Sequence, residues 1–495
     1  MIQYIINTFR GGQSDEDTRG VEGSFKYGHA LDIHKRTDSL SCKQAMAVVL
    51  DETRGMGDYG GTTLTGGVFN FMIPASDGSL YAFSERGSIF ARTSEGNWTF
   101  VYNDPNGAIK GAGEWEGSDG RSYLYWATSS ALARKELPGA NSAPDTGTMR
   151  WTDAVHDYKI EFISSSATWH PIKPIAGALY MGNNEALAQL DFDLNWSPRV
   201  MNIKPQNIIN ALEERDDYAI LGSEKRDGNE EGYIWSWVET AVNYVQKKKI
   251  PIQGVNALIT AELPLLQGGD NGEIFFSDFE SVVPLNAIQG GGKVNPGGVD
   301  IFEDLAVFGF YGGTYPGIWS YGRARKNRPF ALNYDYRLSG TVGGSTISTI
   351  GAVAVTEGVL LASFGSSEIN ADNSYGVEQV STTTKASAVY EGLEFDGGAP
   401  SLQKKFDTVK ITMTPMPAST VVSIKFKLNN DTSWKYAVLG NRTTTYSQTN
   451  STSAIFSIGR PAEVYELGAE LTPSVNDTPE ILSITTYISN EKNEF

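Results

Sequence analysis

The residues best suited to catalysis or metal binding are few in this chain. It holds four histidines and one cysteine among 495 residues. His29 and His34 are five positions apart, and on a strand such side chains point to opposite faces, so they share an ion poorly. His156 and His170 stand alone, and Cys42 has no second cysteine to pair with. We therefore expect histidines that are exposed or hydrogen-bonded, a packing role for Cys42, no disulfide and no metal site.

Carboxylates are abundant, but they form no catalytic motif. With 58 acidic residues, pairs suited to glycoside hydrolysis arise by chance, and their separation in space is not readable from sequence. Residues 227–232, DGNEEG, begin like an EF-hand loop, yet its twelfth position is Val238, where a bidentate glutamate is required. A hairpin turn is the better interpretation. No phosphate-binding, dinucleotide-binding or nucleophile-elbow motif is present. The sequence predicts no catalytic residue, no cofactor and no enzyme activity.

The elements that would position any site are short strands. The aromatic content of 11% and the 53 glycines are typical of a β protein. Residues 68–102 predict four strands, with turns at Asp77-Gly78, Arg86-Gly87 and Glu95-Gly96. The same rhythm returns at intervals of about 40 to 50 residues, which is the signature of β-propeller blades. We expect one propeller over residues 66–385 with about seven blades, six being the alternative.

Two segments within this range allow a second interpretation. Residues 203–221, IKPQNIINALEERDDYAIL, are the best helical candidate, because Ile208, Ile209, Leu212 and Tyr218 could form one apolar stripe, although the ends resemble strands. The segment YIWSW, residues 233–237, could stack sugars. Its aromatic residues alternate like those of a buried blade strand, which is the interpretation that we favour.

A different pattern follows residue 385. In VVSIKFKL the side chains of Val422, Ile424, Phe426 and Leu428 alternate with Ser423, Lys425 and Lys427, as expected for a half-buried antiparallel strand. Residues 386–495 therefore predict a β-sandwich. The expected fold is all-β, and its three parts are residues 1–65 with an arm and the first strands, residues 66–385 with the propeller, and residues 386–495 with the sandwich.

Charge and hydropathy limit the classes of partner. The formal net charge of −18 disfavours binding to nucleic acid and to anionic membranes. No apolar run approaches the ~18 residues of a membrane span. The start, MIQYIINTF, is too short and lacks the basic flank of a signal peptide. We expect a soluble, unprocessed protein.

Both ends of the chain resemble one known group of proteins. The opening pattern F-R-G-G-x-S-D, then G-x-x-G-S-F-x-x-G, then L-D-I covers residues 9–33. The later segments QKKFDTVKITMTPMP, VSIKFKLNN and LGAELTPSVNDTPEILSITTYI include Lys404, Lys405, Phe406 and the run Thr478-Pro479-Glu480-Ile481. Together they resemble virion structural proteins of tailed bacteriophages, over about a third of the chain. The middle resembles the propellers of tail and neck proteins only in rhythm.

The resemblance implies a structural role. It implies a tail nozzle, hub or neck ring protein that is made in the host cytoplasm and built into the virion. Its partners would be other copies of itself and other virion proteins, with phage DNA passing nearby unbound. The alternative is a receptor- or glycan-binding propeller at the tail tip, with or without glycoside hydrolase activity.

In that setting the head of the chain is expected to be an assembly device. Its glycines and charges predict an arm that lies on a neighbouring subunit or along its own propeller rim. Leu31 and Ile33 would lie in a strand that helps to close the propeller. The residues that we expect to carry assembly contacts are Phe9, Arg10, Gly11, Gly12, Asp15, Asp17 and Phe25.

Overall fold

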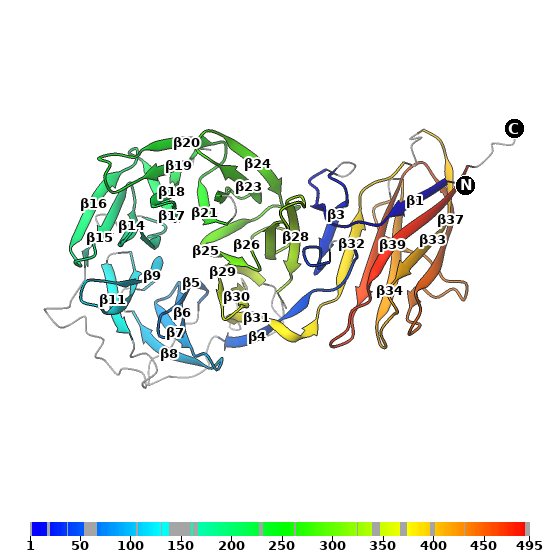
Figure 1. Cartoon of the computed structure of the whole chain (residues 1–495), viewed down its shortest axis with the longest axis horizontal. Coiled ribbons are helices and arrows are strands. Elements are labelled where there is room, and N and C mark those ends of the chain that lie inside the picture. The colour runs from blue at the N-terminus through cyan, green and yellow to red at the C-terminus, as the bar shows by residue number, and fades with distance from the viewer. Residues whose placement is uncertain are drawn as a thin grey trace. The chain divides into compact units, whose positions relative to one another are not determined.

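The computed structural model describes residues 2–16, 20–36, 38–53, 67–104, 107–129, 131–137, 160–161, 167–226, 231–261, 264–323, 325–338, 347–366, 374–396, 401–429 and 431–490. The expected all-β fold is confirmed: the regular elements of these residues are strands (Figure 1). Within the same ranges, no helix has the length and hydropathy needed to cross a membrane.

Two compact units make up the chain, and each is described by itself. The propeller unit comprises residues 48–317 and 338–379. The terminal unit comprises residues 1–47, 318–337 and 380–495, and so holds both ends of the chain. These ranges differ from the contiguous ones expected from the sequence, because residues 1–47 and 318–337 group with the C-terminal strands.

The described residues form seven blades, each with four strands in meander order. Six of these blades are separate four-stranded sheets, whereas the strands of blade six belong to a longer sheet and its last two strands fall almost wholly in residues 318–337, which cluster with the terminal unit. Blade one is β5 (Phe69–Pro74), β6 (Leu80–Ser84), β7 (Ser88–Arg92) and β8 (Trp98–Asn103). Blade two is β9 (Gly111–Glu116), β10 (Ser122–Ala127), β11 (Ala131–Leu137) and β12 (Ile160–Glu161). Blade three is β13 (Ile172–Ile175), β14 (Ala178–Asn183), β15 (Ala186–Leu190) and β16 (Trp196–Asn202). Blade four is β17 (Asn207–Arg215), β18 (Tyr218–Lys225), β19 (Gly232–Trp237) and β20 (Gln246–Ile250).

The remaining blades follow the same order. Blade five is β21 (Val255–Thr260), β22 (Pro264–Gly268), β23 (Glu273–Ser277) and β24 (Val282–Ala287). Blade six is β25 (Lys293–Phe302), β26 (Leu305–Tyr311), β27 (Gly317–Gly322) and β28 (Ala331–Tyr336). Blade seven is β29 (Ile347–Thr356), β30 (Val359–Ser366) and β31 (Ser374–Lys385), completed by β4 (Gln44–Thr53) from the start of the chain.

Neighbouring blades share their apolar cores, which explains why the strands form a ring. One cluster joins blades one and seven through Phe69, Leu80 and Leu361. There the Ser363 hydroxyl also donates a hydrogen bond to the carbonyl of Phe69, at 2.6 Å. A single four-stranded blade exposes an apolar face, so stacking against both neighbours is what stabilises it.

Three details bear on the sequence expectations. The predicted turns of blade one are present, with Gly78, Gly87 and Gly96 all at positive φ. The helical candidate is instead the β17–β18 hairpin, whose turn is Asp216-Asp217. A β-bulge between Ile209 and Ala211 shifts the alternation there and produces the helix-like spacing.

The expected closing strand also lies elsewhere. Leu31 and Ile33 are buried in the core of the terminal unit, whereas β4, about ten residues further on, completes blade seven. The aromatic segment in β19 is buried, as predicted, with Trp235 fully covered. The Trp235 indole donates to the Ser223 hydroxyl at 2.8 Å.

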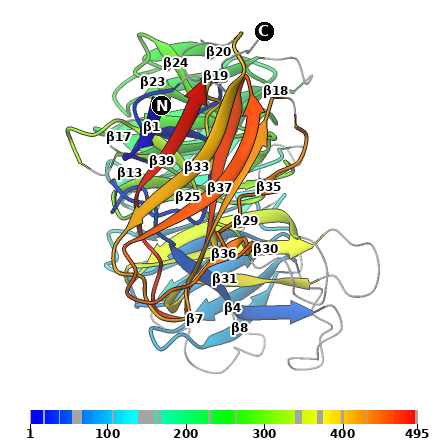
Figure 2. The same ribbon diagram turned by 90° about the vertical axis from the view of Figure 1, so that its right-hand side faces the viewer.

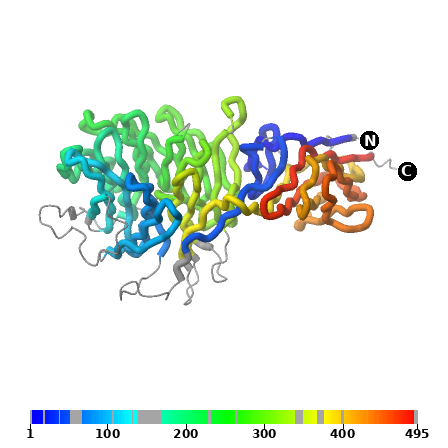
Figure 3. Tube along the Cα trace, turned by 60° about the horizontal axis from the view of Figure 1, so that its bottom comes forward, coloured from blue at the N-terminus to red at the C-terminus, as the bar shows by residue number. Residues whose placement is uncertain are grey.

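The terminal unit contains two sheets around one core. The first sheet has the order β1 (Ile2–Ile6), β39 (Ile481–Asn490), β33 (Lys404–Met413) and β37 (Ser453–Ala462), seen face on in Figure 2. Its first two strands, β1 from the start of the chain and β39 from its last part, are antiparallel neighbours, with Ile2 opposite Ile488 (Figure 3). The second sheet includes β3 (Ser24–His29), β32 (Ala388–Gly392), β38 (Tyr465–Thr472), β34 (Val421–Leu428) and β35 (Lys435–Tyr436). Short strands β2 (Gly12–Gln13) and β36 (Thr445–Tyr446) pair with β3 and β34.

The core of this unit takes side chains from both sheets and from the head of the chain. Phe406 and Ile488 come from the first sheet, Ile424 and Leu467 come from the second, and all of them are buried. Alternation along β34, and along β33 from Val409 onward, points every second residue into this core, as the sequence predicts. A β-bulge between Phe406 and Thr408 interrupts the alternation of β33.

Candidate functional site

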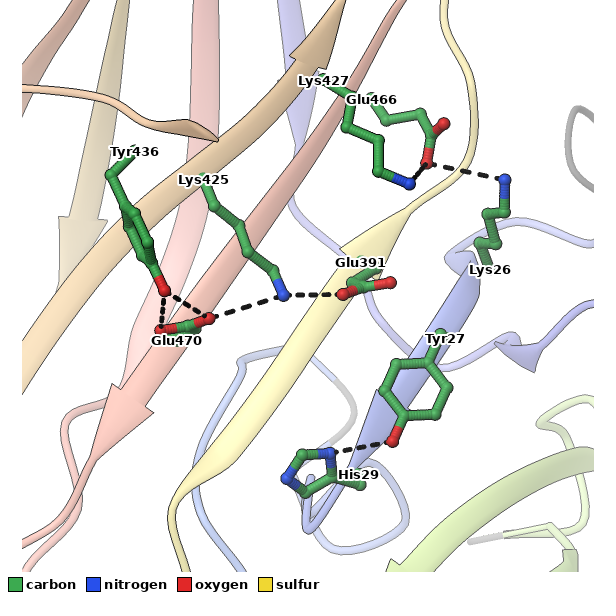
Figure 4. A network of polar contacts seen from close by, with 9 residues as sticks. All are labelled: Lys26, Tyr27, His29, Glu391, Lys425, Lys427, Tyr436, Glu466 and Glu470. Atoms are coloured by element: carbon green, nitrogen blue, oxygen red, sulfur yellow. Dashed lines mark hydrogen bonds and ion pairs between the residues drawn. The ribbon is translucent and has the colours of Figure 1, made fainter. Parts of the chain in front are cut away.

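A charged network covers the face of the second sheet that is opposite the core (Figure 4). Strand β34 turns Val422, Ile424 and Phe426 into the core, and the same alternation turns Lys425 and Lys427 to the other face. Strand β38 places Glu466 and Glu470 on that face by the same rule. Because β34 and β38 are antiparallel neighbours, the lysines of one strand face the glutamates of the other.

Lys425 is the centre of this network. Its ammonium donates a hydrogen bond to Glu391 of β32 at 2.6 Å, and it lies 3.5 Å from a carboxylate oxygen of Glu470. The residue is only 5% exposed. A lysine is rarely buried so completely unless it is paired, and here two carboxylates share its charge.

A glycine makes this geometry possible. In the register of the sheet, Gly468 of β38 lies opposite both Lys425 and Glu391, between the two charged strands. A Cβ atom at Gly468 would lie 2.8 Å from Cγ and Cε of Lys425 and 2.8 Å from the carbonyl oxygen of Tyr390. The lysine side chain therefore crosses the sheet over the glycine to reach Glu391.

Aromatic residues complete the outer side of the network. The Tyr436 hydroxyl of β35 contacts both carboxylate oxygens of Glu470, at 2.9 and 3.0 Å. The ring of Trp434 lies 4.8 Å from the ammonium groups of both Lys425 and Lys427. Such cation–π contacts add to the ion pairs that hold the two lysine side chains in place.

A second branch joins β3 to the same sheet. Glu466 lies 3.6 Å from Lys26 and 4.0 Å from Lys427, and its side chain is 8% exposed. Burial raises the pKa of Glu466, and the two lysines act in the opposite direction. On the same strand as Lys26, the Tyr27 hydroxyl lies 3.1 Å from Nδ1 of His29. Burial lowers the pKa of His29 to about 4, helped by Arg337 and Lys425, so this imidazole is neutral near pH 7.

The charges of the network are balanced, since it contains three lysines and three glutamates. Within the described ranges, no group of three His, Cys, Asp or Glu side chains is placed to hold a metal ion. The arrangement ties five strands together and leaves Tyr436, 45% exposed, at its margin. We regard this face, defined by the nine residues of Figure 4, as the candidate interaction site.

The structure places most of the predicted assembly residues in the terminal unit itself rather than on an extended arm. Phe9 and Phe25 are fully buried, and their rings pack edge-on against Tyr390 with centroids 5.5 and 5.8 Å apart. Arg10 is half-buried and ion-paired with Glu22. The reason is physical: two phenylalanines in one short segment bury enough apolar surface to order it against its own core.

The remaining head residues divide into three kinds. Gly11 and Gly12 are buried, and a Cβ at Gly12 would lie 2.6 Å from the carbonyl oxygen of Leu332. Asp15 is exposed. Asp17 lies outside the described residues.

A buried polar cluster fixes the segment that follows the head. The Lys43 ammonium lies 2.7 Å from the Asp335 carboxylate, and both side chains are almost fully covered. Asn333 donates to the carbonyl of Leu31 at 2.9 Å. His34 lies 3.2 Å from the Ser320 hydroxyl. We regard these contacts as structural, because the Lys43 ammonium, the Asn333 amide nitrogen and the His34 ring each contact another residue of the same unit.

Sequence reasoning did not identify the network. The alternation of Ser423, Lys425 and Lys427 predicts a polar face, and Glu466, Gly468 and Glu470 alternate in the same way. The signal for a pair was therefore present in two segments. What the sequence lacks is the pairing of β34 with β38 and their register, which bring the charges together.

Comparisons with known proteins add little to this geometry. No family model matches the chain, and no curated protein matches it. Similar solved structures include the WD40 β-propeller domain of Doa1, with 13% identity, 68% of this chain and 97% of that chain covered, and a TM-score of 0.44. U3-55K matches with 13% identity, 68% and 100% coverage and a TM-score of 0.44. The Dos1 propeller matches with 10% identity, 74% and 94% coverage and a TM-score of 0.39.

Proposed function

We propose that the protein is a non-catalytic structural component of a tailed-phage virion, a nozzle, hub or neck ring protein, which assembles with other copies of itself and with other virion proteins. In this role the propeller is a rigid body, and the terminal unit supplies contacts. The interaction face around Lys425 would be the contact surface of the terminal unit.

One observation carries the proposal. The two segments that resemble virion structural proteins, residues 9–33 and the strands after residue 400, lie far apart in the sequence but share one core. Phe9 and Phe25 from the first segment and Phe406 from the second are fully buried in that core. Two separate resemblances that form one folded unit support a common origin for that unit better than two isolated matches would.

The interaction face supports a role in contacts between proteins. Protein interfaces are enriched in tyrosine and tryptophan, and their specificity depends on complementary charges at fixed positions. The face offers both, through Tyr436, the adjacent Trp434 and the ordered lysine and glutamate pairs. Its charge balance suits a partner with an equally mixed surface better than it suits DNA, whose phosphates require a basic surface.

Genetic replacement tests the proposal. In the phage genome that encodes the chain, deleting the gene should give particles that lack a tail part or fail to join head and tail. The unaltered chain should restore them. A Tyr436→Ala variant changes an exposed member of the face, so it should fold normally and restore particles poorly, whereas Tyr218→Ala, on the propeller, serves as the matched control. Normal particles after gene deletion would refute the proposal.

A further inference from the structure

The axis of the propeller contains a small cavity with an unequal set of charges. It has a volume of about 190 Å³ and is lined by the innermost strands of the blades. At the density of liquid water this space holds about six water molecules, which is enough for one extended side chain. Its apolar wall includes Ile73, Val299 and Val353.

Three charged residues occupy equivalent positions around this cavity. In three blades, the turn after the first strand begins with a residue at positive φ: Ala176, Asp216 or Glu303. Three positions before each of these residues stands a charged one, namely Lys173, Glu213 and Asp300. All three charged residues line the cavity. They therefore form one layer near the end of the propeller where the first and second strands of each blade are joined.

The charges of this layer do not cancel. Lys173 lies 3.0 and 3.1 Å from the two carboxylate oxygens of Glu213, so these two residues neutralise each other. Asp300 belongs to blade six and forms no ion pair within 4.0 Å with any of the residues that the structure describes. Burial raises the pKa of its carboxyl group, whereas the backbone N–H groups that donate to it and the nearby charge of Lys173 act in the opposite direction. The Asp300 carboxylate is held by backbone N–H groups of Ile301 and Val355, each at 2.7 Å. Two carboxylates therefore share the charge of one lysine, and the layer keeps one excess negative charge, at Asp300.

The turns at this end of the propeller add a field of the same sign. Neighbouring strands of a blade are antiparallel, so every turn between a first and a second strand lies at this end. In blades one, two, four, six and seven these turns carry acidic residues: Asp77, Asp119, Asp216, Asp217, Glu303, Asp304 and Glu357. Arg121 and Arg215 also lie here, and each is ion-paired with an acid. Such a field concentrates cations near the cavity.

We propose that the axial cavity is a binding site for one basic side chain, a lysine or arginine presented by a segment of another protein. The cationic group would pair with Asp300, and the aliphatic stem would lie against Ile73, Val299 and Val353. The acidic turns would attract the basic segment around it. This inference concerns the propeller unit alone and does not depend on a virion role, so either proposal can fail without the other.

The test uses the full chain and three short peptides. Blocked peptides of sequence Gly-Gly-Lys-Gly-Gly and Gly-Gly-Arg-Gly-Gly are titrated by calorimetry at low ionic strength, with Gly-Gly-Gln-Gly-Gly as the neutral control. We expect saturable 1:1 binding of at least one basic peptide and none of the neutral one. Asp300→Asn should weaken binding by about tenfold or more, because hydrogen bonds and ion pairs to a charged group are the strong ones.

Two further variants distinguish binding inside the cavity from general attraction of cations by the acidic turns. Asp217→Asn removes an exposed charge in a neighbouring turn. When the titration is repeated at an ionic strength of about 0.15 M, which screens exposed charges, this change should alter the peptide affinity by less than about twofold. Val299→Phe fills the cavity and leaves Asp300 in place, so it should abolish binding. Equal weakening by Asp217→Asn and Asp300→Asn would overturn the proposal, as would the absence of binding to either basic peptide. Methylammonium binding as tightly as the lysine peptide would overturn the assignment to a protein segment.

Discussion

Replacing Gly468 by alanine probes the centre of the charged network with a single methyl group. The added Cβ would lie 2.8 Å from two carbons of Lys425, which is inside van der Waals contact. It would lie equally close to the carbonyl oxygen of Tyr390, which is backbone in the adjacent strand and yields little. The lysine side chain must therefore leave its path across the sheet and lose its contact with Glu391.

The expected loss of stability follows from these contacts. Forcing an extra methyl group into a packed site costs about 1–3 kcal/mol. Separating a buried lysine from a partner costs about 3–5 kcal/mol when no other partner remains, and here Glu470 remains at 3.5 Å. We therefore expect the free energy of unfolding to fall by about 2–4 kcal/mol. For a unit of this size that lowers the melting temperature by about 5–15 °C.

Calorimetry measures the shift, and two variants control it. Gly440 belongs to the same unit and is exposed, with open space where a Cβ would be added, so Gly440→Ala should leave the melting temperature nearly unchanged. Combining Gly468→Ala with Lys425→Ala should cost less than the sum of the two single changes, because both disrupt the same contact. The geometry described here would be refuted if the Gly468→Ala protein had the same melting temperature as the unaltered chain. It would also be refuted if the loss of stability in the double variant equalled the sum of the losses in the two single variants.

Three other predictions follow from the buried groups. Phe9→Ala should lower the free energy of unfolding by about 3–5 kcal/mol, measured by denaturant titration, because Phe9 is fully covered; an unchanged midpoint would mean that the head is a peripheral arm. Burial lowers the pKa of His170 to about 4, so the unfolded chain takes up this proton first, and up to about 3 kcal/mol of stability is lost as the pH falls from 6.5 to 4. His170→Asn should flatten that part of the stability profile, and an identical slope would contradict the assignment. Burial raises the pKa of Cys42 to about 11, so the native chain should resist thiol reagents at pH 8 and react once denatured; rapid native labelling would show that the thiol is exposed.

The parts of the fold that the sequence predicts are those set by local alternation and turn chemistry. Gly78, Gly87 and Gly96 mark the turns of blade one because positive φ favours glycine. Val422 and Ile424 point into the core because side chains alternate along a strand. These signals need no knowledge of which strands pair.

The parts that the sequence leaves open are set by long-range pairing. Nothing local distinguishes β4 as the strand that completes blade seven, more than 300 residues before its partner β31. The face of β34 that carries Lys425 reads as solvent-exposed, yet Glu391, Glu470 and Trp434 cover it. Phe9 and Phe25 read as the ends of an arm, and their burial depends on Tyr390, which lies far along the chain. In each case the deciding neighbour is distant in sequence.

The proposed function is tested most directly by counting the protein in purified particles. Tailed particles are banded by density from a culture that produces the chain, and their proteins are quantified by mass spectrometry against the major capsid protein. Our account predicts that the chain is present at a fixed copy number that matches the symmetry of a tail or neck ring and survives a second banding. Its absence from intact, infectious particles, with the chain remaining free in the lysate, would contradict the account.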